Sequence, residues 1–467
     1  MMPQNLFFGP EQGRDFLVVK DIVLDHKFTL IGPKTDIGGV FHGPLFYYLL
    51  AIPFLLSSGN PLISSIFLIL IQCSTVILIY LFGKMLVNER VGIISSLLFA
   101  VSFNSILFAR WLSNPPLSIP FVVLTMLFLL NFLKGSKKSL IGFSICLGLL
   151  SQAEFLNTLF YSVITLGTII IFFDRFNKIP KMFLFVNFLI SIITSVGTFV
   201  IFDLRHQFLI LKSILAVLTN QSGYHLSFNA SINSNISGYF NAFTTTIIPF
   251  HQILGVIIFL VSLIHTTVQA KKIKEYYLII LWLIVPLILL ILLRHDALEQ
   301  FFVSIIPAFI ILVAFAVDYI WSKSKVAASV LLIIILMQFI AWVQNIPVNK
   351  NIFFQSTQLE LSYKDELSTI DQIYKDSNHV PFAIQAYTIP YWSQEGWRYL
   401  FWSYGTKKYG IMPSEQKNVK KLFVIVQDDP RNVSYQEDWL KKTVSTWGIA
   451  QSTFRYGILT TRELKLR

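Results

Sequence analysis

The chain has 467 residues, of which 54% are hydrophobic and only 13% are charged, and its mean hydropathy is +0.65. Because soluble domains carry about 25% charged residues, this composition excludes an ordinary soluble protein and indicates one that crosses a membrane many times. The formal net charge of +12 would suggest nucleic-acid binding in a soluble protein, but here it must first be compared with the positive-inside rule.

The first 60 residues precede any apolar run that is long enough to cross a membrane. Within the stretch GPEQGRD, Glu11 and Asp15 are four residues apart and therefore share one face of a helix, with Arg14 beside them. The spacing alone fits a solvated, salt-bridged helix turn as well as a site. The following DFLVVKDIVLD mixes apolar and polar positions, which is typical of a helix at a membrane surface.

The stretch KTDIGGVFHGPLFYYLL follows at residues 34–50. Its two glycines predict a flexible loop, and Pro44 suits the first turn of a helix. His42 lies just before that turn, either as a structural hydrogen-bonding residue or as an anion contact at a helix N-terminus. Residues 44–58 contain Pro53 and are predicted to form a juxtamembrane or re-entrant helix.

Ten later apolar runs are predicted to span the membrane. One set of alternating loops carries 13 Lys and Arg residues and the other set carries four, so the first set is assigned to the cytoplasm. Much of the net charge therefore reports orientation, and the nucleic-acid hypothesis falls away. The expected spans are 61–83, 91–109, 117–133, 139–153, 157–173, 182–203, 247–267, 276–293, 301–317 and 327–343.

This orientation places both ends of the chain outside, together with residues 1–60 and a loop near 204–246. An exterior segment of about 60 residues needs something to export it, so we expect a longer protein with a first helix upstream. Polar and ionisable side chains gather at the exterior ends of the spans, as ordinary membrane-edge groups or as parts of a site. These are Arg110, Asn114, Arg205, His206 and Arg294.

The composition changes sharply after about residue 345. FAIQAY and KLFVIVQ are predicted strands, SYQEDWLKKTVSTWG a helix, and TFRYGILTTREL a closing strand. The expected fold is an all-α polytopic membrane protein with a C-terminal extracytoplasmic α/β domain. Its expected parts are a first extracytoplasmic loop with juxtamembrane helices at 1–60, a transmembrane bundle at 61–343 and a soluble domain at 344–467.

The sequence contains no Gly-rich phosphate-binding loop, no H-E-x-x-H and no G-x-S-x-G. An enzyme acting at the exterior face would therefore use a donor that is not a nucleotide, and a lipid-linked donor fits. Almost no ionisable residue is expected at mid-bilayer, where ion-coupled transporters place theirs.

Two of these stretches resemble the GT-C superfamily of membrane glycosyltransferases, in the branch of protein O-mannosyltransferases and the undecaprenyl-phosphate-aminoarabinose transferase of lipid A. EQGR at 11–14 resembles the family's opening D-E/Q-x-R, and HGPLFYY at 42–48 resembles its K-P-P-L-x-Y-W. RWLSNPPL resembles its second external loop. The likeness covers roughly residues 5–320 and departs from the pattern at Glu11, where the family has Asp, and at His42, where it has Lys.

The resemblance implies transfer of a sugar from a polyprenyl-phosphate donor to an extracytoplasmic lipid, glycan or protein acceptor, with inversion, in the cytoplasmic (inner) membrane. It implies that Glu11 corresponds to the family's catalytic acid and that Asp15 is the second candidate for this role. Because His titrates near pH 6.5, phosphate pairing by His42 would depend on pH. No cofactor is assigned, and a divalent metal is left open. The lipid-phosphate and donor contacts are expected from Arg14, His42, Arg205, His206 and Arg294, and the acceptor or loop contacts from Arg110 and Asn114.

Two alternatives to the enzyme stay open. A transporter or lipid flippase predicts functional charge inside the bundle and paired broken helices. A non-catalytic membrane scaffold predicts that substitutions of the first-loop acids have no effect.

Overall fold

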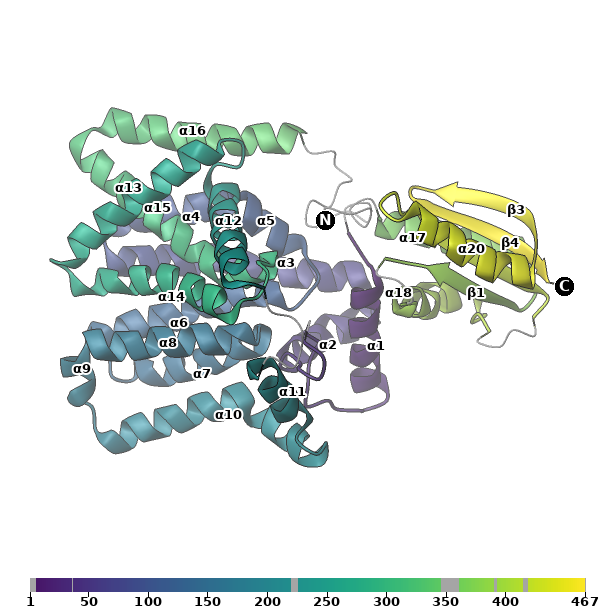
Figure 1. The fold of residues 1–467 in the computed structure, drawn as a ribbon, viewed down its shortest axis with the longest axis horizontal. Helices are drawn as coiled ribbons and strands as arrows, with labels where there is room; N and C mark the ends of the chain where they lie inside the picture. Colours follow the sequence, from purple (N-terminus) through teal and green to yellow (C-terminus); the bar gives the residue numbers. More distant parts are fainter. Residues whose placement is uncertain are drawn as a thin grey trace.

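The computed structural model describes residues 6–35, 37–219, 226–345, 361–389, 393–414 and 419–466. Most of these residues are helical, and a small sheet lies near the C-terminus (Figure 1). The N-terminal helices are α1 Pro10–Leu24 and α2 Leu45–Ser57. The bundle helices are α3 Pro61–Leu86, α4 Glu89–Val101, α5 Phe103–Arg110, α6 Ser118–Leu133, α7 Ser139–Ala153, α8 Leu156–Ile171, α9 Phe173–Asn177, α10 Lys181–Arg205, α11 Leu209–Leu218, α12 Phe228–Ile247, α13 Gln252–Ala270, α14 Tyr277–Leu293, α15 Ile306–Lys323 and α16 Lys325–Asn345. The remaining elements are α17 Tyr363–Ser377, β1 Phe382–Tyr387, α18 Glu395–Leu400, α19 Lys407–Tyr409, β2 Lys421–Gln427, α20 Val433–Trp447, β3 Gly448–Tyr456 and β4 Leu459–Leu466.

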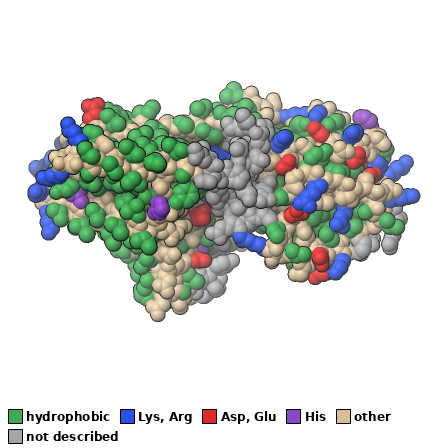
Figure 2. All heavy atoms as spheres, turned by 90° about the horizontal axis from the view of Figure 1, so that it is seen from above, with side chains coloured by type: hydrophobic (Ala, Val, Ile, Leu, Met, Phe, Trp, Pro, Cys, Tyr) green, Lys and Arg blue, Asp and Glu red, His purple; other side chains and the backbone are tan. Residues whose placement is uncertain are grey.

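The bundle has a buried centre and an apolar outside. In the segment of residues 299–323, which contains α15, 89% of the residues in the apolar stretch are buried. The corresponding share is 17% in α10 and 28% in α13. The exposed side chains of α10 and α13 are mostly Ile, Leu, Val and Phe, which suits hydrocarbon around the bundle. Figure 2 shows this hydrophobic surface, with Lys and Arg gathered at the end of the bundle far from the sheet and again on the C-terminal part.

Among the described residues, length and apolar composition identify six helices that could cross a membrane, and the bent pair α4 and α5, which meet at 57°, could form a seventh span. The other three expected spans correspond to the apolar helices α7, α8 and α16, whose apolar stretches have 10–17 residues. The chain is therefore a multi-pass membrane protein, while the count of ten remains a prediction.

One expectation about the bundle is wrong. Much of the exterior loop expected near 204–246 is helical, and α12 packs inside the bundle. Its residues Ser231, Asn235, Tyr239 and Phe243 are buried at four-residue intervals, so one face of this polar helix is buried although only the second half of that face is aromatic. The ring of Tyr239 lies 5.1 Å from that of Phe309 in α15, centroid to centroid.

Helix α1 lies between the bundle and the C-terminal part (Figure 1). It begins with a proline after the N-cap Gly9, as a helix start favours. A Cβ atom added to Gly13 would lie 2.2 Å from the backbone nitrogen of Gly396, so only glycine allows α1 to approach α18 this closely. The rings of Phe16 and Tyr399 meet edge to face at 5.0 Å across the same interface.

The C-terminal unit, defined as residues 361–466, contains a four-stranded sheet in the order β1-β2-β4-β3. Strands β1 and β2 are parallel, and the other neighbouring pairs are antiparallel. Alternate residues of β1 and β2 face α17 and α18 on one side and α20 on the other. The strands FAIQAY and KLFVIVQ and the helix of residues 433–447 are confirmed.

TFRYGILTTREL was expected to form one closing strand, and this is wrong. The chain turns at Gly457, whose φ is +54°, and the residues on either side form the antiparallel strands β3 and β4. The boundary expected at residue 344 lies at the end of α16, next to residues 346–360, which are outside the described residues.

Candidate active site

The centre of the candidate site is Asp15, on the buried face of α1. Its side chain is only 4% exposed. Arg14 Nε donates to Asp15 Oδ1 at 2.9 Å, and the second guanidinium nitrogen lies 2.9 Å from the same oxygen. The hydroxyl of Tyr47, from α2, also donates to Oδ1 at 3.0 Å. Three donors therefore hold one oxygen of this carboxylate in place.

The second oxygen of Asp15 is different, because no donor among the described residues reaches Oδ2. Burial raises the pKa of Asp15 to about 6, against the lowering effects of Arg14 and of the hydrogen bond from Tyr47. A carboxylate with one fixed oxygen, one free oxygen and a pKa of about 6 is suited to accept a proton near neutral pH.

His42 lies beside the junction of α7 and α8 and is 7% exposed. Its Nδ1 accepts a hydrogen bond from the Phe155 backbone N–H at 3.3 Å and lies 3.7 Å from Glu154 Oε1. Burial, helped by the charge of Arg14, lowers the pKa of His42 to about 3. His42 is therefore neutral near pH 7, which differs from the expected titration near pH 6.5, and its Nε2–H remains a neutral donor.

The loop between α5 and α6 contacts both parts of this arrangement. Asn114 is 4% exposed and donates to the carbonyl of Ala153 at 2.8 Å, next to Glu154. Gln12, from α1, donates to the carbonyl of Leu112 at 3.2 Å. The loop therefore fixes α1 and the end of α7 relative to each other, and Asn114 has a positioning role here.

Arg205 and His206 lie at the exposed end of α10. The ring of His206 stacks on Phe202 with centroids 3.9 Å apart, and Phe202 also contacts the ring of Phe41 edge to face at 5.8 Å. Since Phe41 precedes His42 in the chain, the end of α10 lies against the first loop.

Three expected residues lie outside these contacts. Glu11 is exposed in the first turn of α1, one turn before Asp15. Arg110 is half-buried in the last turn of α5. Arg294 ends α14, where its guanidinium lies 5.9 Å from the ring centroid of Phe228 and its carbonyl accepts from the backbone of Leu226. Arg294 is thus held by the start of α12 and by the segment just before it.

Sequence reasoning did not select two residues of the site. Tyr47 lies within the quoted HGPLFYY, but its partner on α1 is 32 residues away and only the fold brings them together. Glu154 is the only acidic residue between Glu89 and Asp174, and it lies 7% exposed at the end of an apolar helix. An isolated acidic residue in an apolar segment is a sequence signal for a functional position, and it could have identified Glu154.

The described residues do not form an evident metal centre. No group of three or more His, Cys, Asp or Glu side chains among them is arranged around a common point. Asp15 faces a guanidinium rather than a second carboxylate, and His42 and Glu154 make only a pair. The divalent metal that the sequence left open therefore has no ready ligand set in the part of the chain described.

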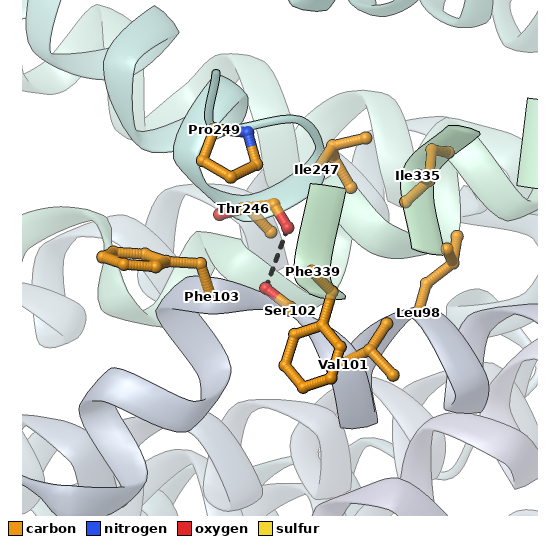
Figure 3. Close-up of a pocket in the computed structure, with 9 residues that line it drawn as sticks. All are labelled: Leu98, Val101, Ser102, Phe103, Thr246, Ile247, Pro249, Ile335 and Phe339. Carbon is orange, nitrogen blue, oxygen red and sulfur yellow. Dashed lines mark hydrogen bonds between the residues drawn. The ribbon is translucent and has the colours of Figure 1, made fainter. Parts of the chain in front are cut away.

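A second polar cluster lies at the break between α4 and α5 (Figure 3). Ser102 Oγ donates to the carbonyl of Thr246 at 2.9 Å, and Asn104 Nδ2 donates to the hydroxyl of Thr246 at 2.9 Å. The cavity beside it is about 10 Å³, room for no more than about one water. None of the nine residues that line this cavity is ionisable, so the break is a neutral, hydrogen-bonded joint.

Comparison with known proteins leads to solved structures only. No family model matches the chain, and no curated protein matches it significantly. The structure of ArnT from Cupriavidus metallidurans bound to undecaprenyl phosphate is similar with a TM-score of 0.61 and 10% identity, covering 99% of this chain and 94% of that one. Archaeal oligosaccharyltransferase AglB from Archaeoglobus fulgidus, in complex with an inhibitory peptide and a dolichol-phosphate, is similar with a TM-score of 0.50 and 12% identity, covering 90% and 66%.

ArnT and AglB are both GT-C glycosyltransferases. At 10% identity the likeness to ArnT concerns the fold and not the residues, and it extends over nearly the whole of both chains. It agrees with the family that the motifs of the first loop resemble. The chain therefore has the same fold as ArnT over nearly its whole length.

Proposed function

We propose that this protein is an integral membrane glycosyltransferase. It transfers a sugar from a polyprenyl-phosphate donor to an acceptor on the extracytoplasmic side of the cytoplasmic membrane. The observation that carries the proposal is the Asp15 carboxylate, buried on the first helix of a GT-C fold with one oxygen fixed and the other free. The polyprenyl phosphates bound to ArnT and AglB support the class of donor.

The proposed reaction is a single displacement. Asp15 Oδ2 accepts the proton of the acceptor hydroxyl, whose oxygen then attacks the anomeric carbon of the sugar from the side opposite the lipid phosphate. The bond between that carbon and the phosphate oxygen breaks, and polyprenyl phosphate leaves with its negative charge. The sugar is thereby transferred with inversion. Tyr47 and Arg14 hold the carboxylate in place while the proton moves.

Asp15 is preferred to Glu11 as the base for a physical reason. The side chain of Glu11 is exposed to solvent, whereas the Asp15 carboxylate is buried and held in one direction by Arg14 and Tyr47. Glu11 occupies the place that the family-like motif gives to the acid, so it stays as the second candidate, one helical turn away. The two assignments predict opposite results for single substitutions.

The leaving phosphate needs donors and positive charge. His42 offers a neutral Nε2–H just before the first turn of α2, a place that favours anions. Arg14 contributes positive charge, and Arg205 and His206 lie on the adjoining end of α10. Arg294 is retained as a more distant candidate, since its contacts are with α12 and the segment before it.

Mass spectrometry of cell-envelope glycans and polyprenyl-phosphate sugars, with and without the gene, tests the proposal. Loss of the enzyme should remove one glycan modification and increase the amount of one polyprenyl-phosphate sugar. Re-expression of the wild-type protein should reverse both changes, and the Asp15→Asn variant should not. Unchanged glycans and unchanged lipid-linked sugars would favour the transporter or scaffold alternatives.

The orientation of the site is tested separately by cysteine labelling in intact cells. The asymmetry of basic loops predicts that cysteines placed at Lys137 and Lys272 are protected, whereas a cysteine at Ser414 reacts with an impermeant reagent. The opposite pattern would place Asp15 on the cytoplasmic side and would contradict an extracytoplasmic acceptor.

A further inference from the structure

A groove of about 550 Å³ lies on the C-terminal unit, away from the candidate active site. Its walls come from the second half of α17, from α19 and from the end of β3. Three of the residues that line it are tyrosines, namely Tyr374, Tyr409 and Tyr456. A groove that combines several aromatic rings with polar side chains is typical of a small-ligand site.

One wall of the groove is held rigidly. The rings of Tyr374 and Tyr409 stack with centroids 4.4 Å apart and planes 16° apart. The Tyr409 hydroxyl donates to Asp371 Oδ1 at 2.8 Å, and Lys408 Nζ lies 3.0 Å from each oxygen of that carboxylate. The hydroxyl of Tyr404 donates to Asp371 Oδ2 at 2.9 Å. The carboxylate is thus fully occupied in orienting the wall and is neutralised by Lys408.

Other groups that line the groove are available to a ligand. Within the described part of the chain, the side chains of Asn378, His379 and Tyr456 form no hydrogen bond with the protein. Asn378 and His379 both adopt positive φ, +52° and +59°, which ends α17 and places these two residues at the groove. Asn378 offers both donors and an acceptor, and Tyr456 offers a ring and a hydroxyl.

These groups match the chemistry of a pyranose ring. A pyranose presents an apolar face of C–H bonds, which packs on an aromatic ring, and a rim of hydroxyls, which need donors and acceptors together. An inorganic anion would need more free positive charge than Lys375 supplies among the described lining residues. We propose that this groove binds a pyranose-containing glycan, at a site separate from the transfer reaction.

Binding of defined saccharides to the full-length purified protein tests this site without any donor lipid. The probes are maltotriose, mannotriose, triacetylchitotriose and a trigalacturonate, and saturation-transfer NMR with a titration gives the affinity. At least one probe should bind. Tyr456→Ala should weaken binding about tenfold, as loss of an aromatic contact does. Asn378→Gly fits the positive φ of that position and should weaken binding about fivefold.

Tyr435→Ala is the matched control, because Tyr435 is a 38% exposed tyrosine on α20, on the other face of the sheet. It should leave the affinity unchanged. The inference is overturned if none of the four saccharides binds, or if binding survives both groove substitutions. Binding of an unstructured peptide at these residues, without binding of any of the saccharides, would also overturn it. Because no donor is present, these results do not depend on whether the protein transfers a sugar.

Discussion

Asp15 and Asp371 have the same kinds of partners in two regions of the molecule and yet differ in what they can do. Each carboxylate contacts one cationic side chain and the hydroxyl of at least one tyrosine. The Asp15 side chain is 4% exposed, whereas that of Asp371 is 37% exposed. At Asp15 the donors converge on one oxygen, while at Asp371 both oxygens are occupied.

The comparison shows that burial and a free oxygen, rather than partner type, distinguish a candidate base from a structural carboxylate. Water screens the charges around Asp371, and its two oxygens already accept hydrogen bonds. Burial at Asp15 raises its pKa to about 6 and leaves Oδ2 ready for a substrate proton. Each prediction below pairs a change near Asp15 with a matched change elsewhere in the molecule.

The largest expected effect is on the rate of transfer. Asp15→Asn removes the proton acceptor with little change of shape, so the rate should fall by about 10²–10⁴. Asp371→Asn should leave the rate unchanged, because that carboxylate only orients groove residues. The measurement is transfer of labelled sugar in reconstituted vesicles, with thermal unfolding to confirm that both variants are folded. Equal rates for the two variants would remove the distinction between these carboxylates.

The next effect concerns the burial of α1. Gly13→Ala places a methyl group 2.2 Å from the backbone nitrogen of Gly396, so α1 and α18 must separate. Such overpacking costs about 1–3 kcal/mol of folding free energy. We expect a lower unfolding temperature and a slower transfer, since Asp15 moves with α1. Gly38→Ala is the control, because a Cβ atom there meets nothing within 4 Å. Equal unfolding temperatures would show that the contact is not tight.

A pH profile tests the raised pKa. The rate should fall as the pH falls through about 6, because Asp15 must be deprotonated to accept a proton. Arg14 lowers this pKa, so in Arg14→Gln the acid limb should move to higher pH. Lys408→Gln, beside Asp371, should leave the limb in place. A limb that stays fixed or moves to lower pH in Arg14→Gln would contradict the assignment.

The smallest effect comes from a single hydroxyl. Tyr47→Phe removes one hydrogen bond to Asp15 Oδ1, which typically contributes about 0.5–1.5 kcal/mol. We expect a rate about 2–10 times lower and a small upward shift of the acid limb, since that hydrogen bond lowers the pKa. Tyr404→Phe removes the equivalent hydrogen bond at Asp371 and should change neither quantity.

The sequence predicted much of the fold where periodicity is local. The strands FAIQAY and KLFVIVQ show apolar runs of strand length, and both are confirmed. The helix α12 was missed because its Asn, Ser and Thr residues resemble a loop, although its buried residues follow a four-residue spacing. The β3–β4 hairpin was missed because a single Gly457 makes the turn.

The candidate site was predictable only in part. The first-loop motif favoured Glu11 as the acid and left Asp15 in reserve, and it is the reserve residue that lies together with Arg14. The choice between Glu11 and Asp15 depends on which face of α1 is buried, and four-residue spacing gives both acids the same face in an ideal helix. Contact with α18 and α2, elements 30 to 380 residues away, buries one and leaves the other exposed. Tertiary packing of that kind is not encoded in a short motif.

Release of polyprenyl phosphate tests the central claim most directly. Purified full-length protein is placed in vesicles made from the native membrane lipids, which supply the donor, together with an extract of the native cell envelope, which supplies lipid, glycan and protein acceptors, and mass spectrometry follows free polyprenyl phosphate over time. The account predicts steady release by the wild-type protein and by Glu11→Gln, and almost none by Asp15→Asn. Release by Asp15→Asn at the wild-type rate, or no release by the wild-type protein, would contradict it.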